Sequence, residues 1–220
     1  MTLDYENIIT KEWKMRKLAV IMLAGLIVFA CDKKEEQKAE ETKTLKPAVE
    51  EKVEYALTEA GNPIVMMKTS MGDIEIEVFA DSCPIHAKNF LKLVEAEIYD
   101  DNIFHRVIAN FMIQTGDPTG TGGGGPGYIL KPESVKYKNK RSYLAMAQSP
   151  QGINGSQFYI LVNDSPHLDN KFPCFAKVIK GMDVVDAISK VKTKKDRPVE
   201  TVKIIEAHPK PPTPPAEQVS

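Results

Sequence analysis

The chain has 220 residues, which is room for one sizeable domain with tails or at most two small domains. Its 29 basic and 30 acidic residues give a formal net charge of -1, so no overall field attracts nucleic acid, and we expect no nucleic-acid partner. The three cysteines are too few for a disulfide framework and lack the paired spacing of a metal site.

The amino-terminal segment has the layout of a secretory signal. Residues 14–17 carry three cations, and an uninterrupted apolar run follows at 18–30. A helix over that run is about 20 Å long at about 1.5 Å per residue, which is short of the ~30 Å hydrocarbon core of a membrane. We therefore predict that residues 1–30 are a signal peptide rather than a transmembrane helix, with Met15 as the candidate true start.

The apolar run ends in Val28-Phe29-Ala30-Cys31, which resembles a bacterial lipobox. In such a motif the cysteine thiol is lipidated and becomes the new amino terminus after cleavage. The resemblance implies a membrane partner through a lipid anchor at Cys31 and an extracytoplasmic location, on the periplasmic side or the cell surface. Ordinary signal cleavage with an incidental cysteine is the alternative, but the small residue before Cys31 and the polar run after it favour lipidation.

The segments on either side of the predicted domain are poor in large apolar side chains. Residues 32–59 are mostly Lys, Glu, Ala and Thr, so they cannot bury enough surface to offset chain entropy. We predict that residues 31–61 are the lipidated cysteine followed by a disordered, charged tether. Five prolines between positions 209 and 215 favour extended backbone, so residues 209–220 are predicted to be a disordered tail.

The folded part is predicted to open with a β-hairpin and a helix. Two strands, 64–69 and 74–78, flank a Ser-Met-Gly-Asp turn, and the alternation in the second strand predicts one buried face. Pro84 then starts a helix with an apolar stripe at helical spacing, for which Asp81 or Ser82 is the expected N-cap.

The rest of the folded part is a series of short strand-like runs separated by Gly, Pro, Asn and Asp, with one more helix starting near Met182. Many short strands with two helices indicate a mainly β domain, over residues 62–208, built as a barrel with capped ends. The remaining strands are predicted at 104–108, 111–114, 143–147, 157–162, 172–178 and 202–205.

Two longer blocks resemble the signature segments of the cyclophilins. The first runs from Phe104 to Asp117 and reads FHRVIANFMIQTGD, and the second runs from Leu144 to Ile160. The resemblance covers about 64–205 and implies peptidyl-prolyl cis-trans isomerase activity on Xaa-Pro bonds. Together with the predicted signal peptide and lipid anchor, it leads us to expect extracytoplasmic polypeptides as substrates, whose folding the enzyme assists. It also implies a closed eight-stranded antiparallel β-barrel capped by two α-helices, with a packed interior and the active groove on its outer face.

Arg106 matches the family's catalytic arginine, and Gln114 is carried over as its catalytic partner. Rotation about an Xaa-Pro amide faces a barrier of about 18–20 kcal/mol set by resonance. A permanently charged guanidinium aimed at the prolyl nitrogen would hold its lone pair out of conjugation. The resemblance places the substrate-binding residues along an apolar seat for proline and a polar strip for the peptide backbone. These are Phe111, Met112, Ala147, Gln148, Gln157, Tyr159, His167, Leu168 and Phe172.

The sequence departs from the family at three groove positions. Tyr159 replaces the usual phenylalanine and adds a hydroxyl that needs a partner if it is buried. His167 and Phe172 stand where many eukaryotic cyclophilins have a tryptophan and a histidine, so we predict activity with weak cyclosporin inhibition. A non-catalytic chaperone module that binds proline peptides in the same groove stays open as an alternative, and a scaffold that only displays loops is a weaker one.

The other patterns are assigned no chemistry. Residues 120–125 fit a dinucleotide fingerprint only formally, because no amphipathic helix begins there and prolines follow. The four histidines are scattered, so we expect no metal site, and nothing in the sequence calls for a cofactor. The sequence leaves open whether Cys83 and Cys174 form a disulfide. We expect a monomer.

Overall fold

The computed structural model describes residues 54–134 and 136–212. The predicted signal peptide, the lipidation site at Cys31, most of the tether and the end of the proline-rich tail lie outside these residues. Within them, no helix combines the length and the apolar character that a membrane crossing requires.

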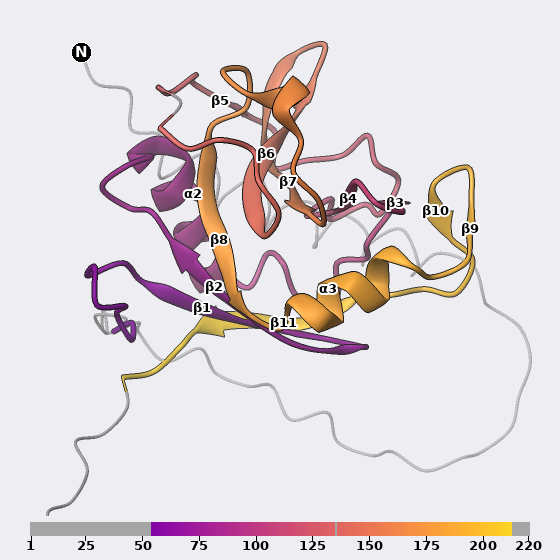
Figure 1. The fold of residues 1–220 in the computed structure, drawn as a ribbon, viewed down its shortest axis with the longest axis horizontal. Coiled ribbons are helices and arrows are strands. Elements are labelled where there is room, and N and C mark those ends of the chain that lie inside the picture. Colours follow the sequence, from indigo (N-terminus) through magenta and orange to yellow (C-terminus); the bar gives the residue numbers. More distant parts are fainter. Residues whose placement is uncertain (1–53, 135, 213–220) are drawn as a thin grey trace, which may run out of the picture. The chain divides into compact units, whose positions relative to one another are not determined.

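One antiparallel sheet curls around the hydrophobic core (Figure 1). Its strands and a separate two-stranded ribbon are β1 (Ile64–Thr69), β2 (Gly72–Val78), β3 (Arg106–Ile108), β4 (Met112–Thr115), β5 (Ile129–Leu130), β6 (Tyr143–Ser149), β7 (Gly152–Leu161), β8 (Cys174–Lys180), β9 (Thr193–Lys194), β10 (Arg197–Pro198) and β11 (Ile204–Pro209). Eight strands form a continuous path in the order β11-β1-β2-β8-β6-β7-β4-β3, and β5 pairs with β7 off this path. The ribbon consists of β9 and β10.

The sheet is an open, curled half-barrel, so the predicted closed barrel is wrong. The two ends of the path, β11 and β3, do not pair as strands, and the residues before them meet through an isolated bridge between Ile103 and Lys203. In β3 the backbone N–H of Val107 donates to the carbonyl of Asp196 in the β9–β10 turn (2.6 Å). Because this turn occupies the free edge of β3, no further strand of the described residues adds there.

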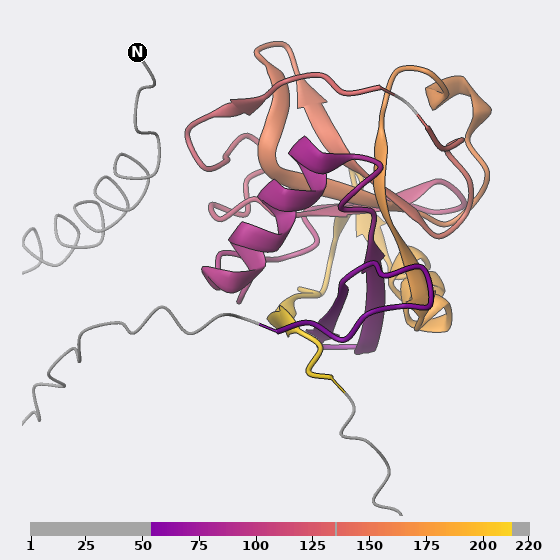
Figure 2. The same cartoon turned by 90° about the vertical axis from the view of Figure 1, so that its left-hand side faces the viewer.

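The two α-helices of the described part, α2 (Pro84–Glu95) and α3 (Met182–Ser189), lie on opposite sides of the curled sheet (Figures 1 and 2). The mainly β architecture with two helices is therefore confirmed. The predicted N-cap of α2 at Asp81 or Ser82 is wrong, because Cys83 is the N-cap residue and makes no side-chain capping bond. The backbone N–H groups of the first turn find a different acceptor, described below.

Both faces of β2 are buried, where the sequence predicted one. Glu75 and Glu77 lie on the face that was expected to be exposed, but their exposed fractions are only 9 % and 5 %. Residues 54–61, which were predicted to end the tether, contact this face, and Thr58 Oγ1 donates to Glu77 Oε1 (3.0 Å). The buried charge is balanced from β8, where Lys177 Nζ lies 3.0 Å from Glu77 Oε2.

The strand alternation separates a packed interior from the outer face. In β7, Phe158 and Ile160 are fully buried in the main core, where the ring of Phe90 from α2 meets Phe158 edge-on at 5.4 Å. Tyr159, which lies between these two residues in the sequence, points to the outer face of the sheet. There it joins a smaller apolar cluster with Met112 of β4. The predicted packed interior is therefore confirmed, and the outer face of β4 and β7 is left to form a site.

Candidate active site

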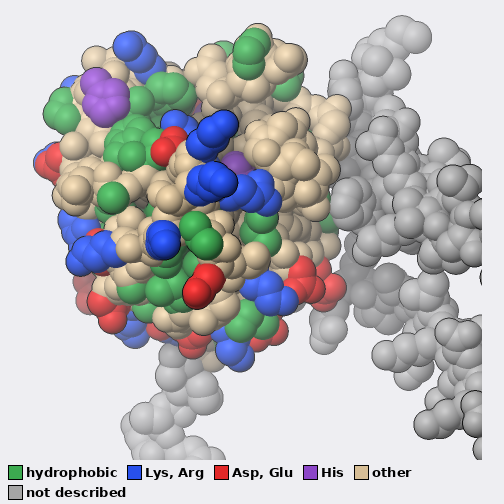
Figure 3. Space-filling view, turned by 90° about the vertical axis from the view of Figure 1, so that its right-hand side faces the viewer, with side chains coloured by type: hydrophobic (Ala, Val, Ile, Leu, Met, Phe, Trp, Pro, Cys, Tyr) green, Lys and Arg blue, Asp and Glu red, His purple; other side chains and the backbone are tan. Residues whose placement is uncertain are grey.

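A groove of about 570 Å³ lies on the outer face where β3, β4, β6 and β7 approach the β9–β10 turn. Figure 3 faces the side of the molecule that carries β9 and β10, and it shows Lys and Arg side chains gathered beside a hydrophobic patch. Most of the site residues predicted from the sequence line this groove: Arg106, Phe111, Met112, Gln114, Ala147, Gln148, Tyr159, Leu168 and Phe172.

Strand register brings Arg106, Gln114 and Tyr159 together across three strands. Arg106 of β3 pairs with Gln114 of β4, and Gln114 pairs with Tyr159 of β7. Directly opposite residues on neighbouring antiparallel strands carry their side chains on the same face, with Cβ atoms about 4.5–5.5 Å apart. Residues that are far apart in sequence therefore become neighbours along one row of the sheet.

A line of hydrogen bonds sets the orientation of the polar groove residues. Gln157 is buried behind the groove, and its Nε2 donates to the carbonyl oxygens of Gly122 (3.1 Å) and Gly124 (2.7 Å). Carbonyls only accept, so Gln157 must turn its Oε1 toward Gln114, whose Nε2 donates to it (2.9 Å). Gln114 Oε1 is then left facing Arg106, whose Nη1 donates to it across 3.5 Å. The glycine-rich loop thus determines which end of Gln114 meets the guanidinium.

The β9–β10 turn contacts Arg106 on the side away from Gln114. The sequence did not predict this contact. Arg106 Nε lies 3.6 Å from Asp196 Oδ2, and the exposed fractions of the two side chains are 47 % and 51 %. At that exposure an ion pair adds little stability, so its effect is on the position of the guanidinium. Lys195 and Arg197 also line the groove. The only available signal was the charged Lys-Lys-Asp-Arg run at 194–197, which is too weak for a prediction.

The apolar half of the groove is a seat built on the outer-face cluster. The rings of Tyr159 and Phe172 meet edge-on with centroids 6.2 Å apart. The Tyr159 hydroxyl is buried and has no hydrogen-bond partner within the described part of the chain, and burial raises the pKa of Tyr159. His167 does not line the groove. It lies on a short 3-10 helix, η1 (Pro166–Leu168), and its ring is tilted against that of Phe111, with centroids 5.5 Å apart.

The glycine-rich loop is organised by Asp117 at its base. The carboxylate of Asp117 accepts the backbone N–H groups of Thr119 (2.8 Å), Gly122 (2.6 Å) and Gly124 (3.0 Å). Burial alone would raise the pKa of Asp117, but these hydrogen bonds hold it below its usual value. The N–H groups of this loop therefore serve an internal carboxylate rather than a bound phosphate.

The two described cysteines are separate buried thiols, which answers the question of pairing that the sequence left open. Burial raises the pKa of Cys174 to about 12. Cys83 instead lies beside His86 and Glu133, in a group of possible metal ligands that sequence reasoning missed. The signal that could have found part of it is the Cys-Pro-Ile-His run at the start of α2, where both side chains fall on one helical turn.

A curled antiparallel half-barrel with two helices and this outer-face groove is the cyclophilin fold. The sequence profile of the family described as "Cyclophilin type peptidyl-prolyl cis-trans isomerase/CLD" matches residues 64–209. The chain therefore belongs to the cyclophilin-type peptidyl-prolyl cis-trans isomerases, a family of enzymes, and the resemblance seen in the sequence is confirmed.

Relatives and solved structures agree with this assignment. Peptidyl-prolyl cis-trans isomerase-like 3 of Mus musculus is 42 % identical over 147 residues, which covers 64 % of this chain and 91 % of that protein. Peptidyl-prolyl cis-trans isomerase CYP71 of Arabidopsis thaliana is 46 % identical over 147 residues, which is 64 % of this chain and 23 % of that protein. The chain thus spans about a quarter of the longer relatives that it matches. A cyclophilin type isomerase of Cryptosporidium parvum, solved in the presence of the dipeptide Ala-Pro, superposes with a TM-score of 0.61 and 33 % identity, covering 66 % of this chain and 97 % of that one.

Proposed function

We propose that the chain catalyses cis-trans isomerisation of Xaa-Pro bonds in polypeptides, and that Arg106 stabilises the twisted amide. The observation that carries the proposal is the hydrogen-bonded line from Gln157 through Gln114 to Arg106, which runs beside an apolar seat. A guanidinium is always charged, so it needs no base or metal to donate to the prolyl nitrogen as that atom becomes pyramidal. No covalent bond breaks, and the chemistry demands only positioned donors.

The groove also offers places for the two other parts of a proline-containing substrate. The proline ring is assigned to the apolar seat around Met112 and Tyr159. The extended backbone before proline is assigned to Ala147 and Gln148. The register between β6 and β7 shifts at this point, so Ala147 has no partner residue in β7. We propose that an extended peptide pairs with the backbone at this irregularity.

The test is the rate at which a short Xaa-Pro peptide relaxes to equilibrium, because the uncatalysed process takes tens to hundreds of seconds. We expect strong acceleration by the wild-type protein and loss of most of it in Arg106→Ala. Lys68→Ala is the control, since it removes an exposed cation that pairs with Glu206 at the far edge of the sheet. A folded wild-type protein that binds the peptide without accelerating it would favour the chaperone-like binding module.

We also propose that the enzyme is a monomeric lipoprotein, anchored through Cys31, that acts on proteins outside the cytoplasm. Support comes from the cations at 14–17, the apolar run at 18–30 and the small residue before Cys31. Mass spectrometry of the mature amino terminus is expected to find Cys31 as the first residue, carrying a lipid. An unmodified Cys31 would contradict the anchor and leave ordinary signal cleavage as the explanation.

A further inference from the structure

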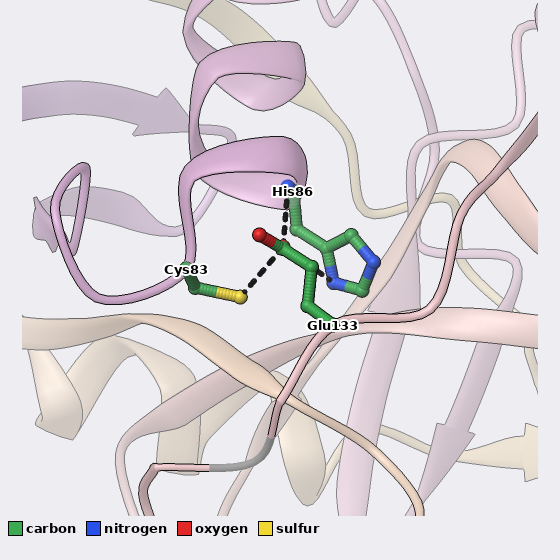
Figure 4. A group of neighbouring side chains, drawn as sticks. All are labelled: Cys83, His86 and Glu133. Atoms are coloured by element: carbon green, nitrogen blue, oxygen red, sulfur yellow. Dashed lines mark hydrogen bonds and ion pairs between the residues drawn. The ribbon is translucent and has the colours of Figure 1, made fainter.

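Three side chains with metal-binding atoms converge at the first turn of α2, away from the groove (Figure 4). Cys83 is the N-cap residue, His86 lies on the first turn, and Glu133 comes from the segment between β5 and β6. The thiol sulfur, a ring nitrogen and a carboxylate oxygen all lie within 4.8 Å of one another. None of the three residues lines the groove, so the proposed isomerase activity does not explain them.

Part of this arrangement is explained by helix capping. Glu133 Oε1 accepts the backbone N–H of Ile85 (2.6 Å), and its Oε2 accepts that of His86 (2.8 Å). The Cys83 thiol also donates to Oε2 (2.9 Å). A carboxylate at a helix N-terminus is favourable because it satisfies free N–H groups and opposes the helix dipole. Capping, however, makes no use of the His86 ring.

The His86 ring directs an unused lone pair into the cluster. Its side chain is 1 % exposed, and Nε2 lies 3.1 Å from the carbonyl oxygen of Lys131. That carbonyl can only accept, so Nε2 carries a proton, and in the neutral ring Nδ1 presents the lone pair. Nδ1 has no hydrogen-bond partner within residues 54–134 and 136–212, and it faces Glu133 Oε2 at 3.7 Å. Two buried acceptors thus face each other with no positive charge between them.

We propose that Cys83, His86 and Glu133 bind one divalent cation of the zinc type. Thiolate, imidazole and carboxylate are the ligands that Zn²⁺ prefers, and its bonds of about 2.0–2.3 Å hold tetrahedral ligand atoms about 3.3–3.8 Å apart. The spacings of 2.9 Å from Sγ to Oε2 and 3.7 Å from Nδ1 to Oε2 are close to that range. The Lys131 carbonyl on the second ring nitrogen is the outer partner that metal-binding histidines usually have.

Binding balances both charge and protons. The Cys83 S–H bond breaks, the sulfur bonds to the metal, and the proton leaves to solvent. One thiolate and one carboxylate then neutralise the 2+ charge in a buried site, and a water molecule takes the fourth position. Glu133 Oε1 keeps its bond to the Ile85 N–H, so α2 stays capped. The proposed site differs from the expectation of no metal site that was drawn from the sequence. The sequence pattern did not indicate it because Glu133 lies 50 residues beyond Cys83.

The test is titration of the tag-free full chain with Zn²⁺ under metal-free reducing conditions, with Co²⁺ as an optical probe of thiolate bonding. Cys83→Ser and His86→Gln each remove a ligand but keep a donor toward Glu133 and Lys131, respectively. Cys174→Ser and His208→Gln are matched controls. Cys174→Ser removes the second described buried thiol, and His208→Gln removes an exposed histidine. Melting curves without metal establish that each variant is folded.

We expect one Zn²⁺ per chain, a thiolate-to-Co²⁺ charge-transfer band, and a rise in Tm with Zn²⁺ in the wild type and both controls. Each ligand variant should weaken binding by at least the roughly 10–100-fold that loss of an outer-shell partner costs a metal site. Absence of Zn²⁺ binding, or binding that survives both ligand variants, would overturn the proposal. X-ray absorption of the zinc-loaded wild type does not depend on how the variants fold. A zinc coordination shell without sulfur would also overturn the proposal.

Discussion

The inner and outer faces of β4 and β7 share one backbone but carry different kinds of side chain. On the inner face, Ile113 and Phe158 are fully buried and contact only the core. On the outer face, Gln114 and Tyr159 stand in register beside each other and line the groove. Because the strand period is two, each residue that stabilises the fold is followed by one available for binding.

The comparison teaches that stability and activity can be altered separately within a single strand. It predicts that inner-face substitutions act mainly on the free energy of unfolding. Outer-face substitutions should act mainly on catalysis, provided that they leave no buried polar group without a partner. Asp117 lies between these cases, since it is buried itself but supports the loop that orients the groove.

The largest effect is expected from Phe158→Ala on the inner face. The substitution removes a fully buried ring that packs against Phe90, so unfolding should become easier by about 3–5 kcal/mol. Urea unfolding followed by circular dichroism measures this change. A loss below about 1 kcal/mol would show that the two faces are not divided as described.

Gln157→Leu tests the outer-face line of hydrogen bonds. Without its amide, Gln114 is free to turn, so kcat/KM should fall about tenfold, which corresponds to about 1.4 kcal/mol in the barrier. The effect should vanish in an Arg106→Ala background, because the line acts through the guanidinium. Equal effects of Gln157→Leu in both backgrounds would contradict the positioning role.

Asp117→Asn tests the loop, and its effect should depend on pH. The folded-state pKa of Asp117 is lowered, so its contribution to stability is present above its ordinary pKa of about 3.9 and is lost as pH falls through the folded-state value. At neutral pH the variant should be less stable by about 1–2 kcal/mol. Urea unfolding of both proteins between neutral and acid pH should show the gap closing, and a constant gap would contradict this account.

The smallest effect is expected from Tyr159→Phe. The substitution removes a buried hydroxyl without a described partner, so the free energy of unfolding should change by less than about 0.5 kcal/mol or rise slightly. Isomerase activity should persist, while the preference among Xaa-Pro peptides shifts. A destabilisation above about 1 kcal/mol would show that the hydroxyl has a partner in solution.

Much of the fold was predictable because local patterns and tertiary contacts agree. The strand at 64–69, the strand predicted at 143–147 and observed at 143–149, and the helix that starts at Pro84 follow from alternation, apolar spacing and a proline signal. The open edge was not predictable, because it depends on the contact of Val107 with the turn at Asp196. Burial of both faces of β2 likewise depends on residues 54–61, whose composition alone indicates a tether.

The groove residues came from the resemblance to a family rather than from local physics. Nothing in the residues alone distinguishes Arg106 from Arg141, which forms a surface ion pair with Asp186 instead (2.7 Å). The structure supplies what the sequence lacked, namely the register that joins β3, β4 and β7 and the turn that holds Asp196. The cluster of Cys83, His86 and Glu133 at α2 was also not predictable from the sequence, because its carboxylate comes from a segment distant in the chain.

The most direct test of the central claim is exchange NMR of an Ala-Pro peptide at equilibrium, with wild type and Arg106→Ala compared at equal bound fraction. This measurement reports binding and isomerisation in one sample. We predict that both proteins shift the peptide resonances, and that only the wild type produces cis-trans exchange peaks on a time scale far shorter than the uncatalysed one. Equal exchange rates for the two proteins would contradict the role of Arg106 in the groove.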